Sequence, residues 1–180
     1  MTIAFPFQLE KAVEAVAALL KLHGGPLNYL ALLKMLYIAD RTALGELEQT
    51  ITGDRYVSMD NGPVLSNVYD LIKGQSVNPG WHQFITTQNY TVELICDPGE
   101  AELSEAELEI LQQVYQNYGN LDPFDIAELT HEFPEWQDPH GSAIAISLEE
   151  ILHNLGKTEA EITQIAEIAQ REVFLGNLLP

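Results

Sequence analysis

One segment of the sequence constrains the fold more than any other. It runs from Asn28 to about Leu44, and its apolar residues occupy the whole circumference of a helical wheel instead of one stripe. A helix that is apolar all round in a globular protein is surrounded by other elements. The segment therefore predicts a buried central helix. It also indicates the fold class: mainly α (α+β), a compact bundle around that helix.

The rest of the bundle is predicted from helical periodicity and from helix-start signals. Apolar residues recur at helical spacing from about Gln8 to Leu22. Further starts are expected where a polar N-cap residue precedes an apolar periodicity; these residues are Ser104, Asp122, Ser147 and Thr158. Three of them are followed three positions later by Glu, which completes a capping box, and Asp122 is followed by a proline at the first helical position.

The expected β content is one small hairpin. Gln83–Thr87 and Tyr90–Cys96 alternate in the manner of strands and are joined near Gln88 and Asn89, and Cys96 is expected to be a small buried hydrophobe. Asn61-Gly62-Pro63-Val64 is expected to begin a helix instead. The reason is that a proline at the first helical position loses only an N–H group that lacks an intrahelical partner anyway.

The net charge narrows the classes of partner. The chain has 27 acidic and 8 basic residues, for a formal charge of -19. Such a chain does not suit nucleic acid or an anionic membrane as its main partner. From Asp97 onward there are 18 acids and 2 bases, which indicates either a solvated surface or a docking face for a basic protein. The oligomeric state stays open.

Localisation and organisation follow from the same composition. A single cysteine permits no internal disulfide and fits a reducing cytoplasm. No apolar run is long enough to span a membrane. No linker or repeat divides the chain, so one domain is expected over residues 1–180, with a C-terminal helical extension over about 147–178.

The sequence offers no convincing catalytic constellation. His131, His140 and His153 lack the short spacing that places two metal ligands on one helical face. No serine lies in a nucleophile elbow, and no glycine-rich segment ends in the residues of a phosphate-binding loop. We therefore expect no enzyme activity, metal or cofactor. A hydrolase site assembled from distant His and carboxylate groups remains an alternative.

Polar and aromatic residues set into turns are the better candidates for function. Asp54 can accept hydrogen bonds from nearby backbone donors, while Tyr56 can bury its ring and keep its hydroxyl paired. Either role fits a purely structural loop as well as a binding site. Downstream, His131 can cap or pack against a helix end, and Trp136 can be a core residue or an exposed anchor.

Several short motifs occur in an order that resembles a known family. They are Lys34-Met35-Leu36-Tyr37-Ile38-Ala39-Asp40, Asp54-Arg55-Tyr56-Val57-Ser58-Met59, Asn61-Gly62-Pro63-Val64 and Val68-Tyr69-Asp70, then Glu128-Leu129-Thr130-His131 with Pro134 and Trp136. Together they cover about residues 28–140 and resemble the Panacea domain, an antitoxin domain of bacterial and phage toxin–antitoxin modules. The chain departs from the family pattern at Met35, where Leu is commoner, and at Asn61, where an aromatic residue or His often precedes Gly-Pro-Val.

This resemblance implies a non-enzymatic, mostly helical protein that neutralises a cognate protein toxin by direct binding. The residues that it implicates in partner binding are Asp54, Tyr56, Gly62, Pro63, Val64 and Tyr69, with His131 and Trp136 secondary. The acidic charge favours a basic toxin. Some relatives act instead as adaptors that deliver a toxin to an ATP-dependent protease, and that alternative also stays open.

Overall fold

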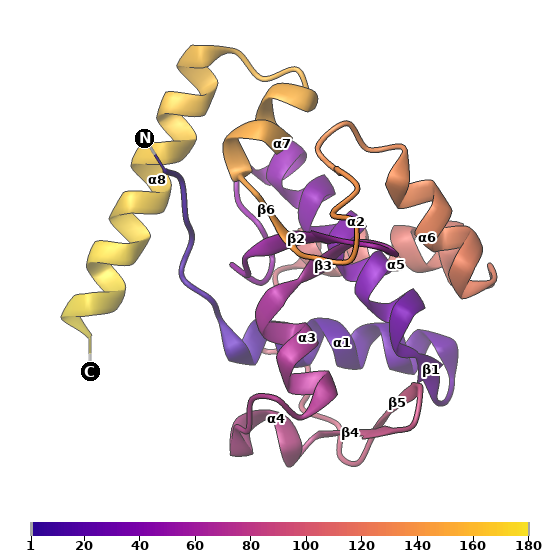
Figure 1. The fold of residues 1–180 in the computed structure, drawn as a ribbon. Helices are drawn as coiled ribbons and strands as arrows, with labels where there is room; N and C mark the ends of the chain where they lie inside the picture. The colour runs from indigo at the N-terminus through magenta and orange to yellow at the C-terminus, as the bar shows by residue number, and fades with distance from the viewer. Residues whose placement is uncertain (1, 180) are drawn as a thin grey trace.

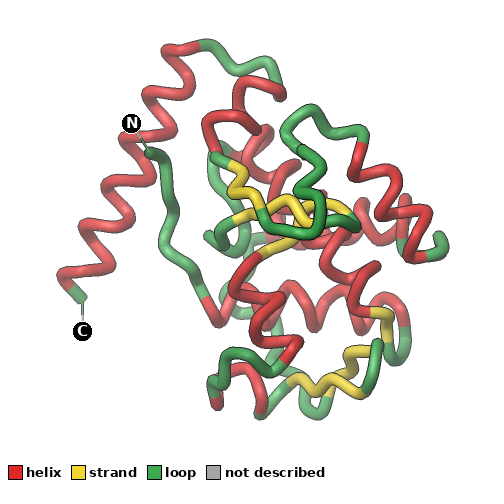
Figure 2. The backbone as a smooth tube through the Cα atoms, in the orientation of Figure 1, coloured by secondary structure: helices red, strands yellow, loops and turns green. Residues whose placement is uncertain are grey.

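A computed structural model describes residues 2–179. Its helices are α1 (Leu9–His23), α2 (Tyr29–Leu47), α3 (Ser66–Lys73), α4 (Pro79–His82), α5 (Glu105–Tyr118), α6 (Pro123–His131), α7 (Leu148–Asn154) and α8 (Glu159–Leu178). Its strands are β1 (Leu27–Asn28), β2 (Tyr56–Met59), β3 (Gly62–Leu65), β4 (Ile85–Gln88), β5 (Thr91–Leu94) and β6 (Ile144–Ile146). Helices dominate, and the strands are short (Figures 1 and 2). The predicted α+β class is confirmed.

Helix α2 is the buried centre of the fold, as the sequence predicts. Every residue from Ala31 to Asp40 is buried. The helix contacts α1, α5 and α6 as well as strand β3, so its apolar circumference is covered on all sides. Its N-terminus is fixed by Asn28, whose side chain accepts a hydrogen bond of 2.8 Å from the Leu30 backbone N–H.

The expectation that Asn61-Gly62-Pro63-Val64 begins a helix is wrong. These residues turn into strand β3, which pairs antiparallel with β2, and helix α3 begins only at Ser66. Pro63 is tolerated because β3 is an edge strand in the sheet order β3-β2-β6. On the open side of an edge strand no neighbouring strand accepts a hydrogen bond, so the N–H group that proline lacks is not needed there. The chain therefore contains a second hairpin that the periodicity alone did not reveal.

The predicted hairpin between about residues 83 and 96 is confirmed as β4 and β5. Strand β1 adds to its β5 edge and makes a second three-stranded sheet. Strand β5, the second strand of this hairpin, ends at Leu94, two residues before Cys96. The cysteine therefore lies in the following loop and is exposed. The expectation of a buried Cys96 is wrong for that reason.

The predicted helix starts are confirmed at all four N-cap residues. Ser104, Ser147 and Thr158 each form both hydrogen bonds of a capping box, and Asp122 accepts a bond of 2.9 Å from the Phe124 N–H. These local signals are reliable because each satisfies free N–H groups without help from distant parts of the chain.

The two ends of the described chain lie on the same side of the molecule. Figure 1 shows the N-terminal segment running alongside α8, between that helix and the bundle. Ile3 and Phe5 are buried there, and the Ile3 N–H donates a bond of 2.6 Å to Glu149. Among residues 2–179, no helix combines the length and the apolar character needed to cross a bilayer.

Candidate partner-binding site

A cavity of about 370 Å³ lies where α2 meets the β2–β3 hairpin and α3. Its lining comes from segments far apart in the sequence: Asn28, Tyr29, Leu30, Leu33, Lys34, Met59, Asp60, Asn61, Val64, Tyr69, Tyr90, Phe124, Gly141 and Ser142. Tyr90 and Phe124 are 69% and 65% exposed. We call this the α2 cavity, and its mouth therefore carries aromatic side chains that no internal contact fully covers.

Lys34 contributes the unusual charge of the α2 cavity. The side chain is fully buried, and Nζ donates a hydrogen bond of 2.8 Å to the Pro63 carbonyl oxygen. Burial lowers the pKa of Lys34 from 10.5 to about 7 because the interior disfavours the charged form. No carboxylate in residues 2–179 forms an ion pair with it. The cation is thus held by one neutral acceptor.

Gly62 allows the hairpin to approach Lys34 closely. Its φ of 108° lies in a region that L side chains rarely adopt. A Cβ atom at this position would collide with Thr130 Oγ1 and lie 3.3 Å from Lys34 Cε. Glycine is therefore required both by the backbone and by the packing of α2, β3 and α6.

Asp54 organises the start of α3 from outside that helix. Its carboxylate accepts backbone N–H bonds of 2.7 Å from Arg55, 2.9 Å from Asn67 and 3.0 Å from Val68. Leu65, the N-cap residue, makes no side-chain cap bond, so Asp54 supplies what the N-cap does not. Burial raises the pKa of Asp54 although these hydrogen bonds act in the opposite direction.

Tyr56 belongs to an internal network around Asp40. Its hydroxyl donates a bond of 2.8 Å to Asp40, which also accepts from Ile51 and Thr52. Burial raises the pKa of Asp40 to about 6, against the opposing effect of these hydrogen bonds. Both side chains are almost fully buried, so the network anchors the loop before β2 to the central helix.

A second buried carboxylate, Glu135, joins α2 to the segment after α6. It accepts bonds of 2.8 Å from the Tyr37 hydroxyl and 2.6 Å from Arg41 Nε, and one of 3.1 Å from Asn154 Nδ2. Burial alone would raise the pKa of Glu135, but the bonds from Arg41 and Tyr37 outweigh it and hold the pKa below its usual value. The Arg41 guanidinium also stacks on Phe133 at 4.2 Å.

His131 and Trp136 form a stacked pair at the end of α6. Their ring centroids are 4.0 Å apart with an interplanar angle of 22°. Trp136 Nε1 donates a bond of 3.0 Å to the Met59 carbonyl oxygen, which ties the pair to the end of β2. Both side chains are half-buried, so Trp136 is neither a core residue nor a free anchor. His131 Nε2 is buried and has no hydrogen-bond partner in the described chain.

The structure separates the candidate residues into two groups. Val64 and Tyr69 line the α2 cavity. The others surround or support it: Asp54, Tyr56, Gly62 and Pro63 are buried in the hairpin and its approach, and His131 with Trp136 lies against the end of β2. That all eight residues contact a partner stays a prediction.

Sequence reasoning named only Val64 and Tyr69 among the residues that line the α2 cavity, and it missed Lys34, Tyr90 and Phe124 in particular. A signal existed for Lys34, because it is a lone cation within the apolar stretch of a helix predicted to be buried. No local signal marked Tyr90 or Phe124, since one lies in the turn between β4 and β5 and the other in α6, and only the tertiary fold brings them together.

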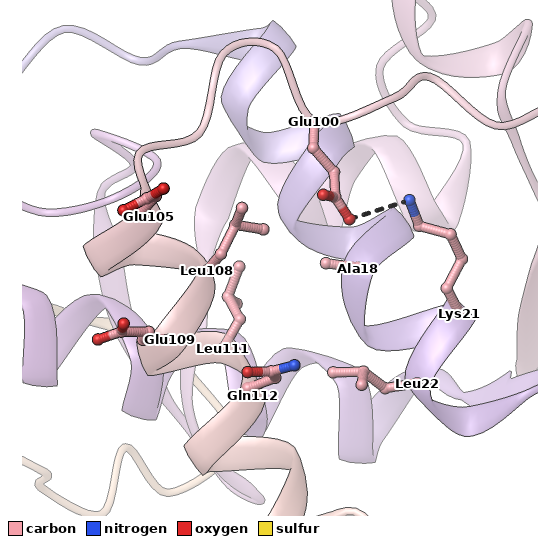
Figure 3. Close-up of a pocket in the computed structure, with 9 residues that line it drawn as sticks. All are labelled: Ala18, Lys21, Leu22, Glu100, Glu105, Leu108, Glu109, Leu111 and Gln112. Atoms are coloured by element: carbon pink, nitrogen blue, oxygen red, sulfur yellow. Dashed lines mark hydrogen bonds and ion pairs between the residues drawn. The ribbon is translucent and has the colours of Figure 1, made fainter.

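A larger and more open hollow of about 550 Å³ lies between α1 and α5. Figure 3 shows Lys21 and Glu100 beside each other, joined by an ion pair of 3.4 Å, and Leu108 and Leu111 projecting from α5. Glu105 and Glu109 also line it. Its charged residues, Lys21, Glu100, Glu105 and Glu109, are exposed, so this is an open hollow and not a closed binding site.

The described chain contains no group of three or more His, Cys, Asp or Glu side chains arranged to hold a metal ion. The buried carboxylates are instead engaged in internal hydrogen bonds, Asp40 with Tyr56 and Glu135 with Arg41.

Comparison with known proteins identifies the family. A model of the family described as antitoxin SocA-like, Panacea domain, matches residues 32–137. No curated protein and no solved structure is a significant match to the chain. The matched residues extend from within α2 to just beyond Trp136, and they include the hairpin, α3 and α6. This chain belongs to the SocA-like antitoxin family that carries the Panacea domain.

Proposed function

We propose that the protein is a non-enzymatic antitoxin that acts in the cytoplasm and neutralises a cognate protein toxin by binding it directly. The observation that carries this proposal is the position of the α2 cavity: its walls come mostly from the family-matched residues, and Tyr90 and Phe124 stand exposed at its mouth. Exposed aromatic side chains beside a pocket are typical of the residues that dominate protein–protein binding energy. Val64 and Tyr69 extend the same surface inward.

The charge distribution supports a basic toxin. Three of the cations are already paired with carboxylates of this chain: Lys11 with Glu107, Lys21 with Asp97 and Glu100, and Arg41 with Glu135. Most of the remaining acidic side chains are exposed or half-buried, and in residues 2–179 no lysine or arginine forms an ion pair with them. Complementary charge raises the rate of encounter with a basic partner, while the aromatic rim supplies the close contact.

The test is co-expression with the product of the reading frame adjacent to this gene. That product should stop growth alone and permit growth with this protein, and the two should co-purify. The decisive variant is Tyr90→Ala combined with Phe124→Ala, which removes the exposed rim without touching the core and should weaken the complex at least about tenfold. Val77→Ala is the matched control, because Val77 is 79% exposed and does not line the α2 cavity.

Two outcomes would contradict the proposal. If no adjacent product is toxic, or if this protein fails to restore growth, it is not an antitoxin of that product. If growth returns because the toxin disappears, with no stable complex and only in cells that retain the ATP-dependent protease, the protein is a proteolytic adaptor instead.

A further inference from the structure

Among residues 2–179, Lys34 is the one lysine or arginine that is fully buried, and it lacks an anion. Lys11 and Arg41 are each paired with a carboxylate at 2.9 Å or less. Lys34 is more deeply buried than either, yet the one acceptor bonded to it in the described chain is the Pro63 carbonyl oxygen. An ammonium group has three donors. Two of its N–H directions are thus left without a protein acceptor.

A cation in this position is unfavourable for the free protein. Removing a charge from water is expensive unless a counterion and good hydrogen bonds replace the water. Met or Leu would fill the same place in an apolar helix without that penalty. The fold instead keeps Lys34 among the residues that line the α2 cavity. Its side chain has no exposed surface, so a bound anion would draw the amine into the cavity to become the missing partner.

The shape and lining of the cavity select the kind of anion. Tyr29, Leu33, Val64 and Tyr69 give it apolar and aromatic walls, and about 370 Å³ is enough for a group the size of an aromatic amino acid side chain. One ammonium group matches one carboxylate, whereas phosphate sites use several donors. Asp60 also lines the cavity and would repel a ligand of higher negative charge.

We propose that the α2 cavity binds a single carboxylate carried on an apolar or aromatic group, with the carboxylate oxygens accepting hydrogen bonds from Lys34 Nζ. The carboxylate belongs either to an acidic side chain or chain end of a protein partner or to a free organic acid. The proposal concerns the chemistry of the cavity and does not depend on whether the protein is an antitoxin.

The direct test uses 3-phenylpropionate and, as a neutral analogue of the same shape, 3-phenylpropionamide. Titration calorimetry or NMR on the full chain should show saturable binding of the carboxylate with a dissociation constant on the order of 1 mM. The amide should bind at least about tenfold more weakly. Equal binding of the two probes, or no saturable binding of the carboxylate, overturns the proposal.

Lys34→Met assigns the binding to this amine, and Lys157→Met is the matched control. Lys157 does not line the cavity. The Lys34 variant, shown to be folded by circular dichroism and thermal unfolding, should lose the preference for the carboxylate, whereas the Lys157 variant should keep it. Unchanged discrimination in Lys34→Met would overturn the proposal.

The affinity should also depend on pH through the amine. Burial holds the pKa of Lys34 at about 7, so binding above that pH requires proton uptake and should weaken by up to about tenfold per pH unit. Other titratable groups line or adjoin the cavity, namely Asp60, Tyr29, Tyr69, Tyr90 and, on α6, His131. If the affinity of Lys34→Met no longer depends on pH, the pH dependence comes from the Lys34 amine and not from these other groups. If the pH dependence remains in Lys34→Met, the assignment to Lys34 is contradicted.

A competition experiment distinguishes the two sources of the carboxylate. If 3-phenylpropionate displaces the product of the adjacent reading frame from this protein, the carboxylate belongs to that partner. If the probe binds and the complex survives, the cavity serves a free organic acid. Both results are consistent with the carboxylate site, and the direct titration is the experiment that tests whether the site exists.

Discussion

Polar side chains on the central helix show how single residues are accommodated in a core. Arg41 is compensated by Glu135, and Asp40 is compensated by four neutral donors that include the Tyr56 hydroxyl. Lys34 has only a carbonyl oxygen. Because an uncompensated buried charge opposes folding, the three residues should make unequal contributions to stability, and Lys34 should make an unfavourable one.

The pH dependence of unfolding measures the contribution of Lys34. Its pKa is about 7 in the folded chain, against the ordinary value of 10.5 for a lysine in water. Below pH 7 the amine is charged in both states and its full penalty applies; between the two values only the unfolded chain holds the proton, so the free energy of unfolding rises with pH. The advantage of Lys34→Met over the wild type in urea unfolding should therefore shrink by about 2 kcal/mol from pH 7 to pH 9.

Lys157→Met is the control for this measurement. Its difference from the wild type should stay constant over the same pH range, because Lys157 lies outside the core. If the free energies of unfolding of the wild type and of Lys34→Met changed in parallel with pH, the amine would not be desolvated as the structure describes.

Asp54 permits a second measurement at the scale of one side chain. Asp54→Ala removes an acceptor from the backbone N–H groups of Arg55, Asn67 and Val68, and should lower the free energy of unfolding by about 2 to 3 kcal/mol. Asp122→Ala removes one exposed cap bond from α6 and should lower it by about 1 kcal/mol. Urea unfolding compares the two, and amide exchange at Asn67 and Val68 should accelerate only in the first. Equal losses would argue against Asp54 as the cap of α3.

At the scale of elements, the β2–β3 hairpin joins the three helices of the candidate site, α2, α3 and α6. Strand β3 contacts α2 and α6, and its end leads directly into α3. Strand β2 receives β6 on its other edge, with Val57 opposite Ala145. Any change that shifts this hairpin should therefore alter the α2 cavity as well as stability.

Gly62→Ala tests the close approach of the hairpin to its neighbours. The new Cβ would meet Thr130 Oγ1 at a backbone φ of 108°, and the substitution should cost about 3 kcal/mol of unfolding free energy. Gly99→Ala, with a φ of 81° but nothing within 4 Å of the added atom, should cost about 1 kcal/mol. Thermal or urea unfolding measures both.

Thr130→Ala provides the specific rescue. Adding it to Gly62→Ala removes the colliding oxygen and should recover at least about 1 kcal/mol relative to additivity. Strict additivity of the two substitutions would show that backbone strain, and not this contact, explains the requirement for glycine.

Some elements of the fold could be predicted from the sequence alone, and others could not. Capping boxes and the all-apolar helix are encoded within a few residues, so they were predicted correctly. The β2–β3 hairpin was not, because Pro63 is compatible with a first helical turn and with an edge strand, and only the pairing with β2 decides between them. Cys96 was misplaced because the end of its strand is set by pairing partners.

The candidate site could be predicted from the sequence only in part, for the same physical reason. Val64 and Tyr69 are marked by their motif, whereas Tyr90 and Phe124 reach the α2 cavity from distant segments. The partner of Tyr37, Glu135, is 98 positions away. No periodicity or spacing encodes contacts of that range.

At the scale of the whole molecule, the charge is arranged asymmetrically. The formal charge is -19, and residues from Asp97 onward hold 18 of the 27 acids. Several of the basic residues are occupied by internal ion pairs. The long-range field is therefore that of an anion, which should accelerate association with a basic toxin and do so most strongly at low salt.

The salt dependence of association tests this field. In stopped-flow mixing with the product of the adjacent reading frame, the association rate constant should fall at least about tenfold from about 0.02 M to about 0.5 M NaCl, with a smaller change in dissociation. Glu105→Gln combined with Glu109→Gln, on the rim of the hollow in Figure 3, should flatten the dependence. A rate independent of salt would exclude electrostatic attraction.

The return of β6 to the edge of β2 has a consequence for synthesis of the chain. The hairpin is complete in sequence at Leu65, but its third strand begins only at Ile144. At bacterial or eukaryotic elongation rates the ribosome needs on the order of 10 seconds to cover that interval. During that time the nascent hairpin presents an unpaired edge. The proposed antitoxin activity should therefore emerge late in translation, and messages truncated before Ile144 should yield chains prone to degradation or aggregation.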